Sequence, residues 1–197
     1  MSKLGIIVAS TRPGRVGLPV AQWIEAEARA HAGFDTIDFI DLAEVALPFM
    51  NEPGHPRFHR YTHQHTRDWS ARVAGCEAFV FVMPEYNHGY NAELKNAIDY
   101  LHVEWQYKPL GIVSYGGVAA GTRAAQMIKP TVVGLKMTPV LESVNIPFVH
   151  QFVDDETGVV PNEMMVAAAR SMFDELVRVE AALRPLRPVL AELRNNG

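Results

Sequence analysis

Five short apolar runs, each followed by a longer amphipathic stretch, constrain the fold of this chain more than any other feature. In the first and third runs the apolar residues do not alternate with polar ones, which is typical of parallel strands covered by helices on both faces. The rhythm predicts repeated strand and helix units around one parallel sheet. The predicted strands lie at Leu4–Ala9, Phe34–Ile40, Ala78–Met83, Leu110–Tyr115 and Thr138–Leu141.

The stretches between and after these runs are predicted to be helices. Gly33 is expected to stop the first helix, Pro130 favours a kink or an early end in the fourth, and Asn162 is expected to cap the last. Alternating strands and helices predict an α/β fold, a doubly wound three-layer sandwich with a five-stranded parallel sheet. The predicted helices lie at Leu18–His31, Arg67–Gly75, Ala92–His102, Thr122–Gly134 and Asn162–Leu183.

Length and composition predict one globular domain. The 197 residues suit a single core, expected at residues 1–183 with a C-terminal tail at 184–197. The net charge of -4, without a Lys/Arg block, disfavours nucleic acid and membrane surfaces as partners. The single cysteine cannot form an intramolecular disulfide, and no apolar run reaches the roughly 18 residues of a membrane span. A soluble cytoplasmic protein is expected.

The loop after the first strand has the composition of a phosphate-binding turn. Ligands of doubly wound sheets bind at the carboxyl ends of the strands, where this loop lies. Hydroxyls, helix N-terminal amides and arginines suit a monophosphate, whereas the endings typical of ATP-binding and dinucleotide-binding loops are absent. From this loop alone, a polar turn with solvated arginines remains an alternative. The candidate contacts are Ser10, Thr11, Arg12, Arg15, Val16 and Gly17.

The loops after the third and fourth strands are the other candidate ligand contacts. The fourth strand ends in two adjacent glycines, Gly116 and Gly117, whose amides can face a ligand without obstruction by side chains. Taken alone, this turn is equally explained as a glycine-rich connection. The third strand ends in Pro84-Glu85-Tyr86-Asn87, followed by the helical sequence Leu94-Lys95-Asn96-Ala97-Ile98-Asp99.

This last pair of motifs resembles the signature of the NAD(P)H-dependent FMN reductase family, which includes quinone, azo-dye and chromate reductases. The first loop is similar to that family's Ser-x-Arg phosphate loop. The resemblance implies a flavodoxin-like fold, FMN as cofactor, NADPH or NADH as hydride donor, a small-molecule electron acceptor, and a homodimer or homotetramer. It places the flavin ring against Pro84, Glu85, Tyr86, Asn87, His88, Gly89, Ser114, Tyr115, Gly116 and Gly117.

The resemblance implies an oxidoreductase that passes hydride from NAD(P)H through FMN to a flavin, a quinone or a similar acceptor. Because the flavin carries the redox chemistry, no catalytic side chain is predicted. One alternative is a flavodoxin-type electron carrier; Arg12 and Arg15 favour the reductase, because such carriers generally hold the phosphate without arginine. A flavodoxin-like interaction protein without activity is the other alternative, since His88 and Gly89 stand where many members have Gly-Ser.

Four histidines fall in the irregular stretch Leu42–Thr66, and the first three are spaced by four residues. Such spacing suggests a zinc site, but Pro56 interrupts the first pair and neighbouring arginines would repel a cation. A solvated lid without metal is the preferred interpretation. The four are His55, His59, His63 and His65.

The remaining candidates are predicted to be structural. Cys76 precedes an apolar strand and is expected in the core. Lys95 and Asn96 are assigned to structure or to a subunit interface, and Asp154 and Asp155 to a turn. A helical strip is assigned to packing: Met164, Met165, Ala168, Met172, Leu176 and Val179.

Overall fold

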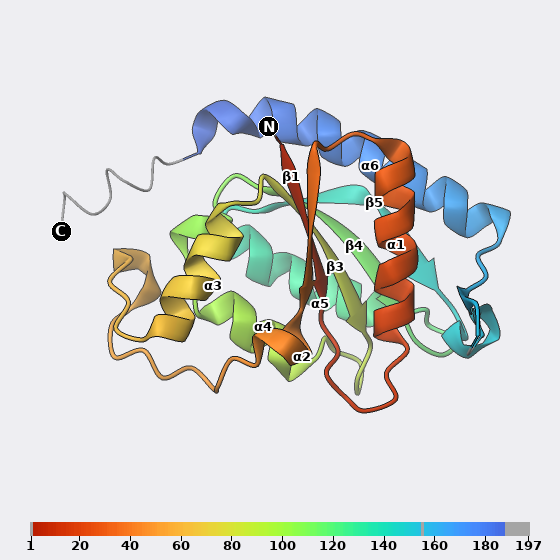
Figure 1. Ribbon diagram of the computed structural model, residues 1–197, viewed down its shortest axis with the longest axis horizontal. Helices are drawn as coiled ribbons and strands as arrows, with labels where there is room; N and C mark the ends of the chain where they lie inside the picture. The colour runs from red at the N-terminus through yellow and green to blue at the C-terminus, as the bar shows by residue number, and fades with distance from the viewer. Residues whose placement is uncertain (1, 155, 188–197) are drawn as a thin grey trace.

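The computed structural model describes residues 2–154 and 156–187 and is built around one five-stranded sheet (Figure 1). All neighbouring strands pair in parallel, in the order β2-β1-β3-β4-β5. This order confirms the predicted doubly wound, flavodoxin-like sheet. The strands are β1 (Lys3–Val8), β2 (Thr36–Asp41), β3 (Ala78–Pro84), β4 (Pro109–Tyr115) and β5 (Thr138–Ile146).

Helices cover both faces of the sheet and enclose two cores. One core lies under α1 (Gly17–His31) and α6 (Glu163–Leu183). The other lies under α3 (Gln64–Ala74), α4 (Ala92–Asp99) and α5 (Thr122–Gly134). Every residue of β3 is buried, as expected of a central strand between two helical layers.

The described part of the chain also contains short elements. They are α2 (Leu42–Val45), β6 (Val153–Asp154), β7 (Gly158–Val159) and the 3-10 turns η1 (Pro56–Phe58), η2 (Val103–Trp105), η3 (Val149–Phe152) and η4 (Arg184–Leu186). Among the described residues, no helix combines the length and the apolar character needed to cross a membrane.

Three local features differ from the expectation: the end of the fifth strand, the early helix end at Pro130 and the helix stop at Gly33. Strand β5 continues to Ile146 instead of ending at Leu141, because a register shift against β4 interrupts the apolar pattern. Helix α5 runs through Pro130 to Gly134; Pro130 and Gln126 are both exposed, so water can reach the carbonyl that proline leaves without a donor. Helix α1 ends at His31, as predicted, but its C-cap is Ala32, which adopts the left-handed conformation one residue before the expected stop at Gly33.

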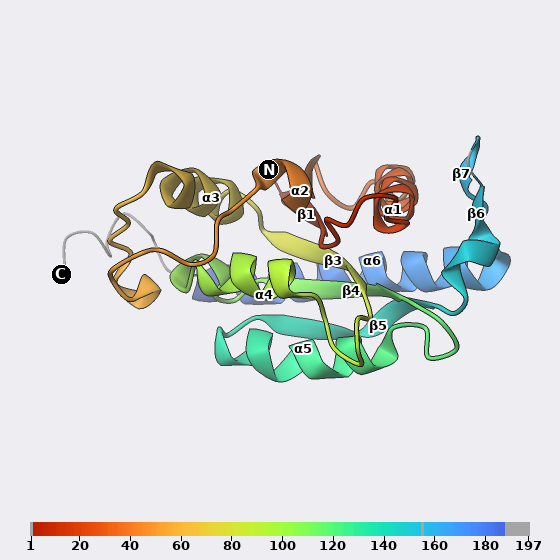
Figure 2. The ribbon, with the colours of Figure 1, turned by 90° about the horizontal axis from the view of Figure 1, so that it is seen from below.

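The carboxyl ends of the parallel strands meet at one edge. In Figure 1 strand β1 runs downward from the N-terminus, so this edge is the lower one, and Figure 2 views the molecule from that side. The loops after β1, β3, β4 and β5 all emerge here. The fold therefore brings the three predicted ligand loops, and one further loop, to the same side.

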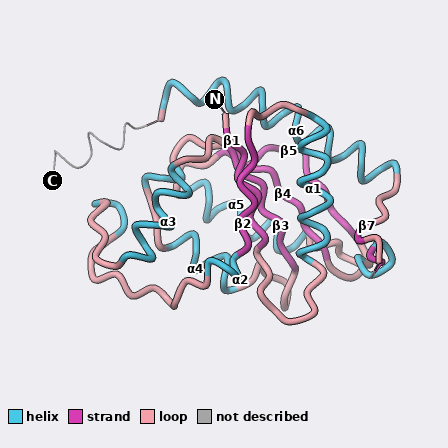
Figure 3. Tube along the Cα trace, in the orientation of Figure 1, coloured by secondary structure: helices cyan, strands magenta, loops and turns pink. Residues whose placement is uncertain are grey.

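The stretch between α2 and α3 crosses the surface largely as loop (Figure 3). It is fixed to α4, because the Asn96 side chain donates to Pro48 O (2.8 Å) and accepts from Met50 N (3.0 Å). Its far end is held by Glu104, a buried carboxylate that accepts from Tyr61 Oη (2.7 Å). Asn96 is thus structural, as predicted, and Lys95 forms an ion pair with Asp99 (2.5 Å).

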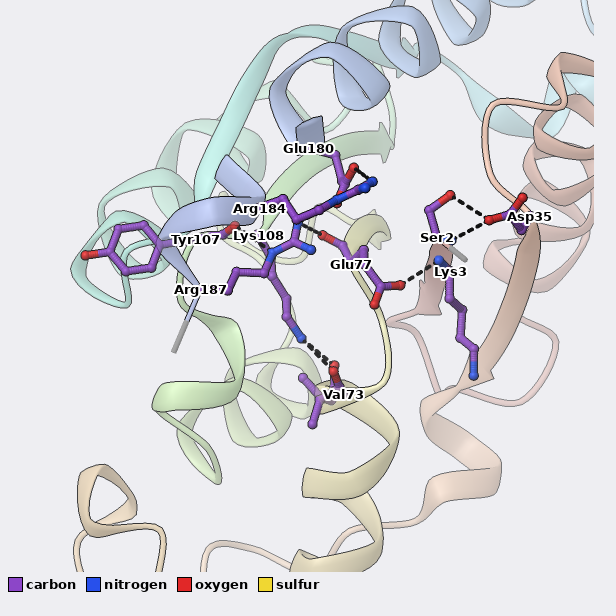
Figure 4. A network of polar contacts seen from close by, with 11 residues as sticks. Ser2, Lys3, Asp35, Val73, Glu77, Tyr107, Lys108, Glu180, Arg184 and Arg187 are labelled. Atoms are coloured by element: carbon purple, nitrogen blue, oxygen red, sulfur yellow. Dashed lines mark hydrogen bonds and ion pairs between the residues drawn. The ribbon is translucent and has the colours of Figure 1, made fainter. Parts of the chain in front are cut away.

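At the opposite edge, ion pairs tie the end of the described chain to the domain (Figure 4). Arg187 contacts the buried Glu180 carboxylate at 2.9 Å and donates to Glu77 O at 2.8 Å. Burial would raise the pKa of Glu180, but hydrogen bonds and charge from Arg184 and Arg187 outweigh it and hold that pKa below its usual value. The domain boundary after residue 183 stays a prediction, and residues 188–197 lie outside the described part.

Replacing Arg187 should destabilise the fold. Arg187→Ala leaves Glu180 paired only with Arg184, whose side chain is more exposed. We therefore expect the free energy of unfolding to fall by about 1–3 kcal/mol. Chemical denaturation measures this change. Arg184→Ala is the control. An equal fall in the free energy of unfolding of that variant would show that Arg187 does not stabilise Glu180 more than Arg184 does.

Candidate functional site

A cleft of about 490 Å³ opens at the carboxyl edge of the sheet. Its volume lies in the range of roughly 300–1,000 Å³ that small-molecule sites occupy. All three predicted loops contribute to it, so residues far apart in the sequence form one site. The lining residues are Arg12, Arg15, Val16, Pro84, Glu85, Tyr86, Tyr115, Gly116, Gly117, Phe148, Val149, His150 and Gln151.

The N-terminus of α1 faces this region with free amides. Val16 is its N-cap, no side chain accepts a hydrogen bond there, and the first turn contains no acidic residue. Within the described chain, no residue accepts a hydrogen bond from the amides of Val16, Gly17 or Leu18. Unpaired amides and the helix dipole together attract an anion.

The two arginines of the first loop have different surroundings. Arg15 forms an ion pair with the buried carboxylate of Asp41, whose other oxygen accepts from Ala43 N (3.0 Å) at the start of α2. Arg12 is exposed, and no described residue forms a hydrogen bond or ion pair with its guanidinium. Arg12 is therefore the arginine of this loop that is available to a bound anion.

A buried hydrogen bond joins the first loop to the end of β4. Tyr115 Oη donates to Ser10 Oγ at 3.0 Å, and burial raises the pKa of Tyr115, which keeps its hydroxyl protonated. Gly17 packs against this pair: a Cβ at that position would lie 2.3 Å from each of the two oxygens. The pair fixes the position of the α1 N-terminus relative to the glycine loop.

The loop after β3 is held by α5. Glu85 accepts from Arg123 N (3.1 Å) and pairs with the Arg123 guanidinium (2.7 Å). Tyr86 and Gly89 exchange two backbone hydrogen bonds across Asn87 and His88, which both have positive φ. This tight turn exposes Tyr86 beside the cleft.

The glycine loop after β4 is open on the ligand side. A Cβ at Gly117 would meet nothing within 4 Å, whereas Gly116 packs against Gly121 N. Ser114 is buried below them and donates to Ala120 O (2.8 Å), so its side chain supports the loop from inside. The loop can approach a flat ligand through its backbone.

Several predicted contacts lie beside the cleft and do not line it, and their direct role in binding stays a prediction. Thr11 turns to the other side of the first loop, where it donates to Glu93 Oε1 at 2.9 Å. The residues concerned are Ser10, Thr11, Gly17, Asn87, His88, Gly89 and Ser114. Conversely, the fourth wall, Phe148–Gln151, was not predicted, because the fifth strand was expected to end at Leu141. A strand extended to Ile146 places this turn at the same edge.

Three histidines of the Leu42–Thr66 stretch make contacts within the protein. His59 is not solvated, as a lid would require, but contacts the buried Glu104 carboxylate at 3.3 Å. His63 and His65 stack on each other with ring centroids 5.2 Å apart. In the described ranges, no three His, Cys, Asp or Glu side chains are grouped as metal ligands.

The other structural assignments are largely confirmed. Cys76 is fully buried, and burial raises the pKa of its thiol to about 12. Asn162 caps α6 by accepting from Met165 N (2.9 Å), and Asp154, the last residue of β6, accepts from Thr157 N (2.8 Å) in the turn that follows. Met164 is an exception, because 79% of its surface is exposed. Asp155 lies outside the described residues.

Residues 2–151 match the family model described as NADPH-dependent FMN reductase. The chain belongs to this family. An NAD(P)H-dependent FMN reductase of Schizosaccharomyces pombe is 40% identical over 149 residues, 74% of each chain. Another of Saccharomyces cerevisiae is 36% identical over 145 residues, covering 68% of this chain and 75% of the relative. The predicted family, and with it an FMN-dependent oxidoreductase, is confirmed.

Solved structures agree on the fold. The flavoenzyme NAD(P)H:(acceptor) oxidoreductase FerB from Paracoccus denitrificans superposes with a TM-score of 0.73 at 18% identity, covering 92% of this chain and 98% of that one. A Streptococcus pneumoniae flavodoxin superposes with a TM-score of 0.55 at 11% identity, covering 90% and 99%. At these identities the likeness concerns the flavodoxin-like fold alone.

Gly17 should not tolerate a side chain. Gly17→Ala places a methyl group against Ser10 Oγ and Tyr115 Oη, and we expect a loss of about 1–3 kcal/mol in the free energy of unfolding. Thermal or urea denaturation measures it. Gly117→Ala is the matched control because its added methyl group meets no neighbour; equal stability of both variants and the wild type would contradict the packing described here.

Proposed function

We propose that this protein is an NAD(P)H-dependent oxidoreductase that holds FMN in the cleft and passes hydride from NAD(P)H to a flavin, a quinone or a similar small acceptor. The observation that supports it most strongly is the meeting of three loops around one cleft, where Arg12 of the first loop has no partner among the described residues. Membership of the NADPH-dependent FMN reductase family supports the choice of FMN.

The phosphate of FMN would bind at the first loop. The free amides of Val16, Gly17 and Leu18 and the guanidinium of Arg12 supply donors and positive charge there. Arg15 lines the same region, but its charge is matched by Asp41. We therefore assign the direct phosphate contact to Arg12 and a positioning role to Arg15, which keeps the loop against α2.

The ring of FMN would bind between the loops after β3 and β4. Pro84 and the exposed Tyr86 provide an apolar and aromatic wall, and the amide of Gly117 can face the ring edge. The Gly116 amide, contrary to the expectation from the sequence, donates to Ile146 O at 3.3 Å. Bound FMN supplies the hydride chemistry, and donors at its pyrimidine edge stabilise the negative charge of the reduced form. The protein itself binds, orients and stabilises.

The finer assignments of partners and location are part of the same proposal. Family membership supports a homodimer or homotetramer, and exposed apolar side chains such as Phe49 and Leu141 are compatible with subunit contacts. One buried thiol without a partner cysteine supports a reducing, cytoplasmic location. The mild net charge supports a small-molecule acceptor and no nucleic acid or membrane partner.

The direct test is reconstitution with FMN followed by assays of NADH and NADPH oxidation, with a quinone or free FMN as acceptor. We expect a yellow complex and oxidation of at least one dinucleotide. Failure to bind FMN would contradict the proposal. Bound FMN that neither dinucleotide reduces would instead identify an electron carrier.

Arg12 should account for affinity toward the phosphate. Arg12→Ala removes a charge-assisted contact of about 1.5–3 kcal/mol, so FMN should bind roughly ten- to hundredfold more weakly. The affinity for riboflavin should not change, because riboflavin lacks the phosphate. Stability should not change, because the side chain has no partner among the described residues. Equal FMN affinity in the variant and the wild type would remove Arg12 from the site.

A further inference from the structure

The turn after β5 forms the fourth wall of the cleft and is locked to the glycine loop. Phe148 N donates to Gly117 O at 3.1 Å, and Val149 N donates to Gly116 O at 3.2 Å. Val149 is buried in the core under α1 and α6, which anchors the turn from behind. The position of Phe148 beside the glycine loop is therefore fixed by the backbone.

Phenylalanine is an unfavourable residue at this position on folding grounds. Its backbone is left-handed, with φ 45° and ψ 50°, a region that glycine and asparagine tolerate and bulky side chains avoid. Burial does not compensate, because 49% of its surface remains exposed. A strained and half-exposed aromatic residue in the lining of a cleft suggests a role toward a ligand.

We infer that Phe148 is a fourth contact for the flavin ring, outside the three loops of the family resemblance. The inference rests on the proposed function, since it takes FMN as the occupant of the cleft. The Phe148 ring would pack against the flavin ring of FMN, beside Gly116 and Gly117. Arg12, in contrast, acts at the phosphate end.

Flavin titrations of Phe148→Asn test the assignment, followed by fluorescence or absorbance. Asparagine accepts the left-handed backbone but removes the ring, so we expect the affinities for FMN and for riboflavin to fall by a similar factor, about tenfold. Arg12→Ala should instead lower only the affinity for FMN. Phe148→Tyr, which keeps the ring, should retain wild-type affinity for both.

Lys136→Asn is the matched control. Lys136 is also exposed and left-handed, with φ 60°, but it precedes β5 at the opposite edge of the sheet. When all proteins are measured without flavin, both asparagine variants should have melting temperatures at or above that of the wild type. A marked fall in the melting temperature of Phe148→Asn would show that Phe148 has a packing role and would overturn the assignment.

The remaining outcomes are distinct. If the wild type binds FMN and Phe148→Asn binds it equally well, the assignment is wrong while the proposed function stands. If Phe148→Asn weakens the binding of FMN but not that of riboflavin, Phe148 acts at the phosphate end and the proposed contact with the flavin ring is wrong. If the wild type binds no flavin, the proposed function fails and the assignment fails with it.

Discussion

Parallel pairing of the strands is the constraint on which the rest of this structure depends. Because β1, β3, β4 and β5 run in the same direction, their carboxyl ends meet at one edge, and the loops that follow them must share it. The hydrogen bond between Ser10 and Tyr115 then fixes two of these loops against each other. A single geometric rule thus brings distant residues into one cleft.

Some charged residues of that cleft are paired within the protein, and others remain available to a ligand. Arg15 and Glu85 both line it, yet each is paired, Arg15 with Asp41 and Glu85 with Arg123. Their charges maintain the architecture of the loops, since leaving the buried Asp41 carboxylate or the partly buried Glu85 carboxylate unpaired would be costly. Arg12 and the free amides of α1 remain for an anionic ligand. The site therefore separates residues that shape it from residues that can bind.

Much of this could be predicted from the sequence, because apolar runs of strand length and loop motifs are local signals. The strands, the layers and the three loops followed from such signals. Pairings set by tertiary structure did not: Asp41 lies 26 positions from Arg15, and no local pattern shows which arginine is neutralised. Phe148–Gln151 were missed because the register shift between β4 and β5 breaks the apolar alternation after Val140.

Hydrogen exchange of backbone amides, with and without FMN, tests the central claim most directly, since it locates the occupant of the cleft without mutation. The account predicts slower exchange at Val16–Leu18 and at Gly117 on addition of FMN. It also predicts no change at Leu42–Phe49, part of which lines a separate cleft of about 520 Å³ on the other side of Thr11. Protection of Leu42–Phe49 with none at the α1 N-terminus or the glycine loop would contradict it.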